Sequence, residues 1–252
     1  MKPLLQEKRP NFYDYLKVLA IITMTLDHIG YYLFPEYEWL RVIGRIAFPI
    51  FLFLVGFSWS YKRKQNLFGV AVIVQIFLSF SHYYFDYGSG VGNILLWICL
   101  ARVGLDTIER TQNRWIRWGI IGLFIGGQFL LQGILDYEAL PFFFALRGRI
   151  AKKYPQYFAR WNIILILTFI RTIKVFNFGF TDGNLEKTQI LFLLFIGLYL
   201  LFQELKKRNT PLLTKYHFFN KGILFLSKNS LYYYGIHILI LLWLGRWEYG
   251  LI

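Results

Sequence analysis

The sequence is short of several things that soluble domains usually contain. Of its 252 residues only 17% are charged, and the 14 acidic residues are half as numerous as the 28 basic ones. Soluble domains carry about 25% charged residues. A single cysteine, Cys99, excludes an internal disulfide and has no metal-ligating neighbour in the sequence. These shortages exclude a disulfide scaffold, give no reason to expect a metal, and disfavour a soluble domain.

Apolar residues take the place of the missing charge. The chain is 56% hydrophobic and 21% aromatic, with a mean hydropathy of +0.43. Nine apolar runs are visible, at residues 16–34, 44–61, 66–85, 93–108, 118–135, 139–150, 161–180, 189–204 and 222–245. An apolar run of about 20 residues can cross a bilayer as a helix. We therefore predict an all-α fold, a polytopic membrane helical bundle of about nine transmembrane helices, formed as a single domain over residues 1–252.

The basic residues lie in alternate connectors between these runs. Segments 2–9, 62–64, 110–117, 147–160 and 206–221 contain 19 lysines and arginines, whereas segments 36–38, 86, 136–138 and 182–187 contain one. Cationic loops face the cytoplasm. We therefore expect a multi-pass protein of the inner (cell) membrane, with its N-terminus in the cytoplasm. The formal net charge of +14 then indicates membrane lipids as partners, with no nucleic acid.

Two of the nine runs contain basic residues. Arg147 and Arg149 fall in the sixth run, so we expect that helix to emerge early into its basic loop. Arg171 and Lys174 fall in the seventh run. A charged group at that depth is costly and usually faces the interior of a bundle, so we expect Arg171 to line it.

The first apolar run contains two consecutive ionisable residues, Asp27 and His28. Such residues inside a membrane helix usually mark a functional site. His28 lies 12 residues after Leu16, which is about 18 Å along a helix and past the bilayer midplane towards the outside. Neighbours on a helix point about 100° apart, so the two side chains should not bond each other; Asp27 shares a face with Tyr31. A neutral imidazole suits a general base, and the alternative is a histidine satisfied by a neighbouring helix.

Two arginines at the outer start of the second run interrupt the charge pattern. Arg41 and Arg45 are four residues apart and share a helix face. Asp27 on the antiparallel neighbour is the nearest acidic residue in that apolar region, so we expect an Asp27–Arg45 pair, or an arginine that binds an anionic group of a substrate. The alternative is that both arginines reach the outer headgroups. Pro49 removes a helical hydrogen bond and predicts a kink beside a cavity.

The last run contains Tyr233 and His237, which are four residues apart and place two polar groups on one helix face. A purely structural role is equally compatible with that spacing, since aromatic residues are abundant throughout. Asn93, at the start of the fourth run, and Asp136, at the outer end of the fifth, are further candidates for contact with a substrate.

The segments from Leu16 to Gly30 and from Leu40 to Phe51 resemble the opening of the TraX family, and the region around Asp136 and the segment from Leu231 to His237 are also similar. That family takes its name from a protein that acetylates the N-terminus of a conjugative pilin subunit, and it is similar to integral-membrane acyltransferases with a histidine in the first helix. The resemblance implies that His28 is the catalytic histidine, with Asp27 and Arg45 beside it. It also implies acetyl-CoA, or another acyl-CoA, as the donor.

The resulting prediction is a transmembrane acyltransferase, in which His28 is a general base or a transient acyl carrier. The acceptor is an amine or a hydroxyl on a protein N-terminus, a glycan or a lipid. A rival prediction is a proton-coupled transporter or channel that uses Asp27, His28 and Arg45 as a relay. A third is a membrane assembly protein without chemistry, in which the polar residues only lock helices together.

Overall fold

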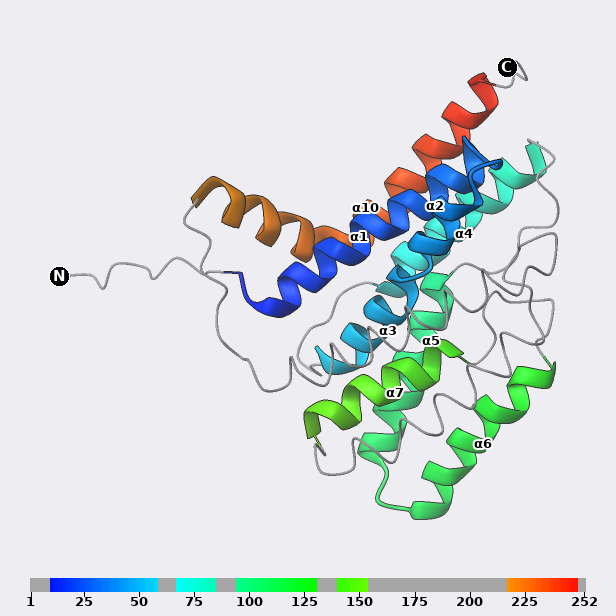
Figure 1. The fold of residues 1–252 in the computed structure, drawn as a ribbon. Coiled ribbons are helices and arrows are strands. Elements are labelled where there is room, and N and C mark those ends of the chain that lie inside the picture. Colours follow the sequence, from blue (N-terminus) through cyan, green and yellow to red (C-terminus); the bar gives the residue numbers. More distant parts are fainter. Residues whose placement is uncertain (1–9, 59–66, 85–93, 131–139, 154–216, 249–252) are drawn as a thin grey trace. The chain divides into compact units, whose positions relative to one another are not determined.

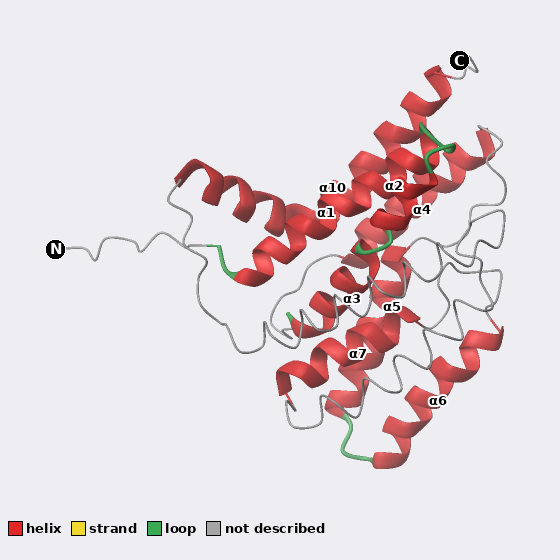
Figure 2. Ribbon diagram, viewed as in Figure 1, coloured by secondary structure: helices red, strands yellow, loops and turns green. Residues whose placement is uncertain are grey.

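The computed structural model describes residues 10–58, 67–84, 94–130, 140–153 and 217–248. They form helices α1 (Phe12–Tyr32), α2 (Glu38–Gly44), α3 (Ala47–Phe57), α4 (Leu67–Tyr84), α5 (Ile94–Arg110), α6 (Arg114–Leu130), α7 (Leu140–Lys153) and α10 (His217–Glu248) (Figure 1). The described residues contain helices and short connections but no strand (Figure 2), which confirms the predicted all-α class. The runs predicted at 161–180 and 189–204 lie outside the described residues.

The chain divides into two compact units. One comprises Met1–Ile50 with Asn184–Leu241, and the other comprises Phe51–Gly183 with Leu242–Ile252. In the first unit the described helices are α1, α2 and most of α10; in the second they are most of α3 and all of α4 to α7. The prediction of a single domain stays a prediction.

Helix α1 begins four residues before the apolar run because a capping box starts it. The side chain of Asn11 accepts a hydrogen bond from the backbone N–H of Asp14, and the carboxylate of Asp14 accepts one from the backbone N–H of Asn11. These bonds satisfy two donors that a helix N-terminus otherwise leaves unpaired. The same carboxylate accepts a 2.5 Å hydrogen bond from Ser227 Oγ on α10. The cap therefore also joins α1 to α10.

The second apolar run, predicted at 44–61, starts at a break between α2 and α3, and Pro49 explains where that break lies. Arg45 and Ile46 form the turn between the two helices, and Pro49 is the third residue of α3. A proline has no N–H for the carbonyl four residues earlier, and its ring clashes with that carbonyl. The break therefore falls at Arg45, one turn before the proline. Arg45 consequently lies in a turn at the end of α2 instead of inside a continuous helix.

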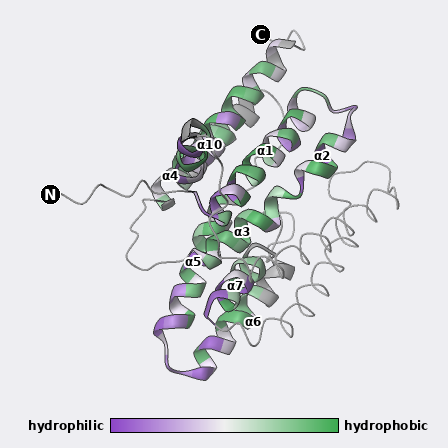
Figure 3. Cartoon of the chain, turned by 60° about the vertical axis from the view of Figure 1, so that its left-hand side comes forward, coloured by the Kyte–Doolittle hydropathy of each residue, from purple (hydrophilic) through white to green (hydrophobic). Residues whose placement is uncertain are grey.

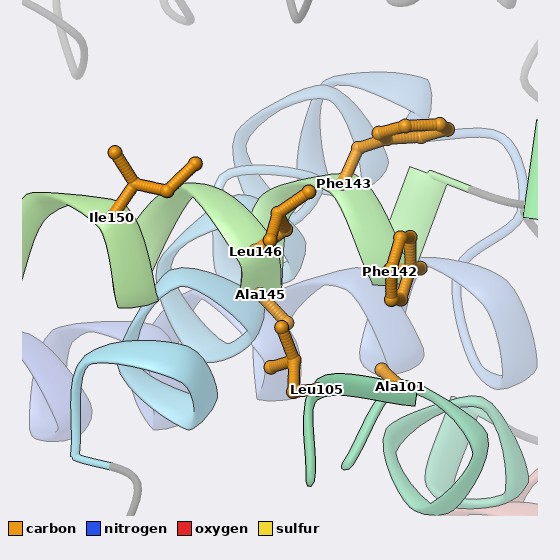
Figure 4. Close-up of a cluster of buried hydrophobic side chains, with 7 residues drawn as sticks. All are labelled: Ala101, Leu105, Phe142, Phe143, Ala145, Leu146 and Ile150. Carbon is orange, nitrogen blue, oxygen red and sulfur yellow. The ribbon is translucent and has the colours of Figure 1, made fainter. Parts of the chain in front are cut away.

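The second unit is held by an apolar cluster between α5 and α7 (Figure 4). Ala101 and Leu105 of α5 are fully buried against Phe142 and Ala145 of α7, and three further α7 side chains complete the cluster: Phe143, Leu146 and Ile150. Helix α7 also approaches α3 very closely at Gly148. A Cβ atom there would lie 2.9 Å from the backbone nitrogen of Phe57, so this contact has no room for a side chain.

The early emergence predicted for the run at 139–150 stays a prediction, but its basic residues lie in a helix and not in a loop. Helix α7 continues to Lys153, and Arg147 within it is only 6% exposed. Nearby, Arg149 binds Glu109 of α5 with two guanidinium nitrogens, Nε and Nη2, the latter at 2.6 Å from Oε2, and Lys153 lies 3.8 Å from the same carboxylate. Burial alone raises the pKa of Glu109, but the hydrogen bond from Arg149 and the surrounding positive charges outweigh it, so the pKa is lowered. Arg149 and Lys153 of α7 therefore bind α5 as part of the helix.

One helical segment of the described residues, Glu38–Phe57, is long and apolar enough by length and composition to cross a membrane. Two shorter apolar stretches, Ala71–Phe80 and Tyr232–Gly245, also occur in the described helices. Figure 3 shows mostly hydrophobic residues along α3 and hydrophilic ones at the connection between α5 and α6. The larger prediction of nine crossings stays a prediction.

Candidate functional site

The first unit brings together residues from both ends of the chain around α1. Because Asp27 and His28 are consecutive on that helix, their side chains point in different directions. Asp27 is buried against the end of α2, whereas His28, which is partly buried, contacts α10. Asp27 thus has its partner in the turn after α2, and His28 has its partner on α10.

Asp27 is paired with Arg45, as the sequence predicts. Asp27 Oδ1 lies 3.6 Å from Arg45 Nε, and both side chains are largely buried, at 12% and 11% exposed. This distance is that of an ion pair and is longer than a hydrogen bond. The short distance between α1 and α2 depends on Gly44, where a Cβ atom would lie 2.5 Å from Asp27 Cα and 2.6 Å from its backbone nitrogen. A second close approach occurs at Gly30, where a Cβ atom would lie 2.8 Å from Leu40 Cβ.

The other two candidates at this end of the site contact each other. The Arg41 guanidinium carbon lies 5.0 Å from the centre of the Tyr31 ring, within the range of a cation–π interaction. Tyr31 is exposed and Arg41 is partly buried. The two arginines thus differ in their surroundings, since Arg45 lies beside a buried carboxylate and Arg41 lies over a tyrosine ring.

His28 forms a hydrogen bond with the other candidate histidine. His28 Nδ1 lies 2.7 Å from His237 Nε2, and the two rings are stacked with their centres 4.9 Å apart. His237 Nδ1 in turn lies 2.8 Å from the backbone oxygen of Tyr233, one helical turn earlier on α10. His237 is buried. The first and the last described helices of the chain therefore meet through two imidazoles in series.

Three residues around this pair are not among the site residues predicted from the sequence, although helical spacing places Tyr32 on the face of His28. Thr25 Oγ1 lies 3.0 Å from the hydroxyl oxygen of Tyr233, and the rings of Tyr32 and Tyr234 each lie 6.2 Å from that of His28. Thr25 is three residues from His28, so the same helical spacing is a signal for it as well. Tyr234 follows Tyr233 and carries no signal that separates it from the other tyrosines of the chain.

The structure does not bring every predicted residue to the site. Asn93, Asp136 and Arg171 lie outside the described residues. In the described part of the chain, no three histidine, cysteine, aspartate or glutamate residues are placed to hold a metal ion. The described site therefore consists of an ion pair and a histidine pair that share one helix.

The fold and the site define a class of helical protein. Its first helix carries a histidine that is hydrogen-bonded to a second histidine, and an aspartate in a buried ion pair. Residues 13–245 match the family described as TraX protein, and the chain belongs to that family. It is 28% identical to an uncharacterized protein of Rickettsia prowazekii (strain Madrid E), with 98% of each chain covered.

Two relatives carry the name TraX. The chain is 30% identical to Protein TraX of Escherichia coli over 42% of this chain and 43% of that protein. It is 23% identical to Protein TraX of Escherichia coli (strain K12) over 75% of each. No solved structure matches the chain.

Proposed function

We propose that this protein is an integral-membrane acetyltransferase. It moves an acetyl group from a thioester donor such as acetyl-CoA to an amine or a hydroxyl. Membership of the TraX family, which takes its name from a protein that acetylates a pilin subunit, supports the type of reaction. The observation that carries the proposal is the position of His28, which is hydrogen-bonded to His237 and adjacent in sequence to the buried Asp27–Arg45 pair. His28 provides a proton acceptor at the end of α1. Arg45, paired with the neighbouring Asp27, provides a cation.

His28 acts as the general base in this proposal. It removes the proton from the acceptor amine or hydroxyl as the nitrogen or oxygen attacks the thioester carbonyl. The new bond to the acetyl carbon forms, the carbon–sulfur bond breaks, and the thiolate leaves. The imidazolium of His28 then returns the proton to that thiolate, which leaves both His28 and the products neutral.

Arg45 supplies positive charge, and Asp27 holds it in place. A buried cation beside the reacting carbonyl stabilises the oxyanion that develops there, and the same cation suits an anionic group on a substrate. The Asp27 carboxylate at 3.6 Å fixes the guanidinium near α1. Arg41 and Tyr31, which contact each other, form the adjoining surface for substrate, and Asn93, Asp136 and Arg171 are proposed as further substrate contacts.

In the proposed topology the protein crosses the inner membrane nine times, with its N-terminus in the cytoplasm. Support comes from the Glu38–Phe57 segment, which is long enough to span, and from the alternation of basic connectors. In this topology His28 lies in the outer half of the membrane, while the thioester is on the cytoplasmic side. The long pantetheine arm of the donor therefore enters the bundle to reach the histidine.

The proposal is tested with purified protein in lipid nanodiscs, radiolabelled acetyl-CoA and a membrane extract as the source of acceptors. Transfer of label to protein, lipid or glycan is expected in the wild type. His28→Ala is expected to lower that transfer at least a hundredfold, because general-base catalysis contributes about 10²–10⁴ in rate. His82→Ala, which removes an imidazole from α4 in the other compact unit, is the matched control and keeps wild-type transfer.

Transfer that persists in the folded His28→Ala variant contradicts the catalytic assignment. Solute flux into proteoliposomes that needs no acyl donor and is lost in His28→Ala contradicts the proposed activity and favours a transporter. Thermal unfolding of each variant in the same nanodiscs shows whether a loss of transfer comes from the missing base or from a loss of structure.

A further inference from the structure

The hydrogen bonds around His237 define which ring nitrogen carries the proton in each histidine. The backbone oxygen of Tyr233 can only accept a hydrogen bond, so His237 Nδ1, at 2.8 Å from it, must be the protonated nitrogen. In a neutral imidazole the other nitrogen then has a lone pair. His237 Nε2 is therefore an acceptor, and it faces His28.

The same reasoning extends one step to His28. Its Nδ1 lies 2.7 Å from His237 Nε2, and because that nitrogen is an acceptor, His28 Nδ1 must donate. A neutral His28 with its proton on Nδ1 has its lone pair on Nε2. The Tyr233 carbonyl thus determines the tautomer of His237, and His237 determines that of His28. Nε2 of His28 is therefore the nitrogen that can take a proton.

We propose that His237 is a positioning residue that holds His28 in the Nδ1-protonated tautomer and so makes Nε2 the base. This inference rests on the proposed function for its role in catalysis, but the tautomer itself follows from the hydrogen bonds alone. When His28 Nε2 takes a proton during the reaction, its Nδ1–H becomes a charge-assisted donor to His237. Such bonds are shorter and about twice as strong as neutral ones. His237 therefore binds the charged form of His28 more tightly than the neutral form and stabilises the transition state.

The arrangement separates the roles of the neighbouring groups. The carboxylate of Asp27 faces Arg45, so it does not orient the imidazole, as its place next to His28 in the sequence could suggest. Thr25 binds the hydroxyl of Tyr233, whereas His237 binds the backbone oxygen of the same residue. The hydroxyl contact can therefore be removed without removing the acceptor of the His237 proton.

Two substitutions of His237 test the proposal, because they differ in one property. His237→Leu removes the acceptor for His28 Nδ1, whereas His237→Gln offers a side-chain oxygen that can accept from it. Thr25→Val is the control that removes the Tyr233 hydroxyl contact. In the serine-protease triad, loss of the group that fixes the histidine tautomer lowers kcat by about 10⁴. We expect His237→Leu to lower kcat at least tenfold with the KM for acetyl-CoA unchanged, and His237→Gln to recover most of that loss.

The ¹⁵N NMR spectrum of the histidine side chains distinguishes this role from a purely structural one, because it reports which ring nitrogen is protonated. The chain has four histidines, so ¹⁵N-histidine labelling in nanodiscs gives few signals, and the spectrum of His28→Gln assigns those of His28. Without any substrate, wild-type His28 is expected to be protonated at Nδ1 and unprotonated at Nε2. His237→Leu is expected to convert it to a mixture of tautomers or to the Nε2-protonated form.

Three results overturn the inference. They are a wild-type His28 protonated at Nε2, a His28 signal unchanged in His237→Leu, and a folded His237→Gln variant as slow as His237→Leu. Failure of the proposed function gives a different pattern. In that case no acetyl transfer is found in the wild type, while the tautomer of His28 and its dependence on His237 remain as described.

Discussion

The contact between Gly44 and Asp27 makes the sharpest prediction about stability. In Gly44→Ala, the new methyl group would lie 2.5 Å from Asp27 Cα and 2.6 Å from its nitrogen, whereas ordinary contacts are 3.4–4 Å. The obstacle is backbone inside a helix, which cannot rotate away as a side chain could. To restore ordinary contact, α1 and α2 must move apart by about 1 Å, an overpacking that costs about 1–3 kcal/mol. The same movement separates Asp27 from Arg45.

The assay is thermal unfolding in nanodiscs, measured by tryptophan fluorescence. For a domain of this size each kcal/mol shifts Tm by about 2–4 °C, so Gly44→Ala is expected to unfold about 2–12 °C below the wild type. The matched control is Gly222→Ala on α10 of the same compact unit, where a Cβ atom meets nothing within 4 Å. There alanine relieves the cost of a helical glycine, about 0.5–1 kcal/mol, so Tm stays or rises. Equal Tm values for the two variants would refute the argument.

Two further predictions concern an ion pair and a hydrogen bond that join helices. Glu109→Gln replaces the charged partner of Arg149 and is expected to destabilise the protein by about 1–2 kcal/mol at pH 7. The pKa of Glu109 is lowered in the folded protein. The stability difference between wild type and variant should therefore be present above the ordinary pKa of 4.5 and should vanish as the pH falls through the pKa of the folded protein. A stability difference that is the same at pH 3 and pH 7 contradicts this prediction. Ser227→Ala removes the 2.5 Å hydrogen bond to Asp14 and is expected to cost about 1–3 kcal/mol, seen as faster amide exchange at the start of α1. Unchanged exchange there would show that the bond does not hold the helix end.

The sequence was sufficient for the class of fold and for the approximate positions of most described helices, but not for their ends. The apolar run begins at Leu16, whereas α1 begins at Phe12 because the capping box of Asn11 and Asp14 is polar. The prediction of a kink from Pro49 was correct in kind, but the break lies one turn earlier, at the carbonyl that the proline ring excludes. The sequence predicts a basic loop from about residue 147, whereas Arg147 is buried within α7, which continues to Lys153.

The site was predictable only where its partners are close in sequence. Asp27 and Arg45 lie on consecutive apolar runs, and antiparallel packing of such neighbours is the usual arrangement, so their pairing could be predicted. His28 and His237 are 209 residues apart. Their pairing depends on where α10 lies, which periodicity does not report. The sequence identified each histidine as polar within an apolar helix, and only the fold shows that they bind each other.

The consecutive positions of Asp27 and His28 have a thermodynamic consequence. The two residues belong to one rigid helix, so the ion pair and the histidine pair share a common support. An anion that binds Arg45 competes with Asp27 for the guanidinium and changes the electrostatic field at the next residue. If binding at Arg45 alters the proton affinity of His28 by some factor, protonation of His28 must alter the affinity for that anion by the same factor. Occupancy of the proposed anion site at Arg45 and the proton affinity of His28 are then reciprocally linked.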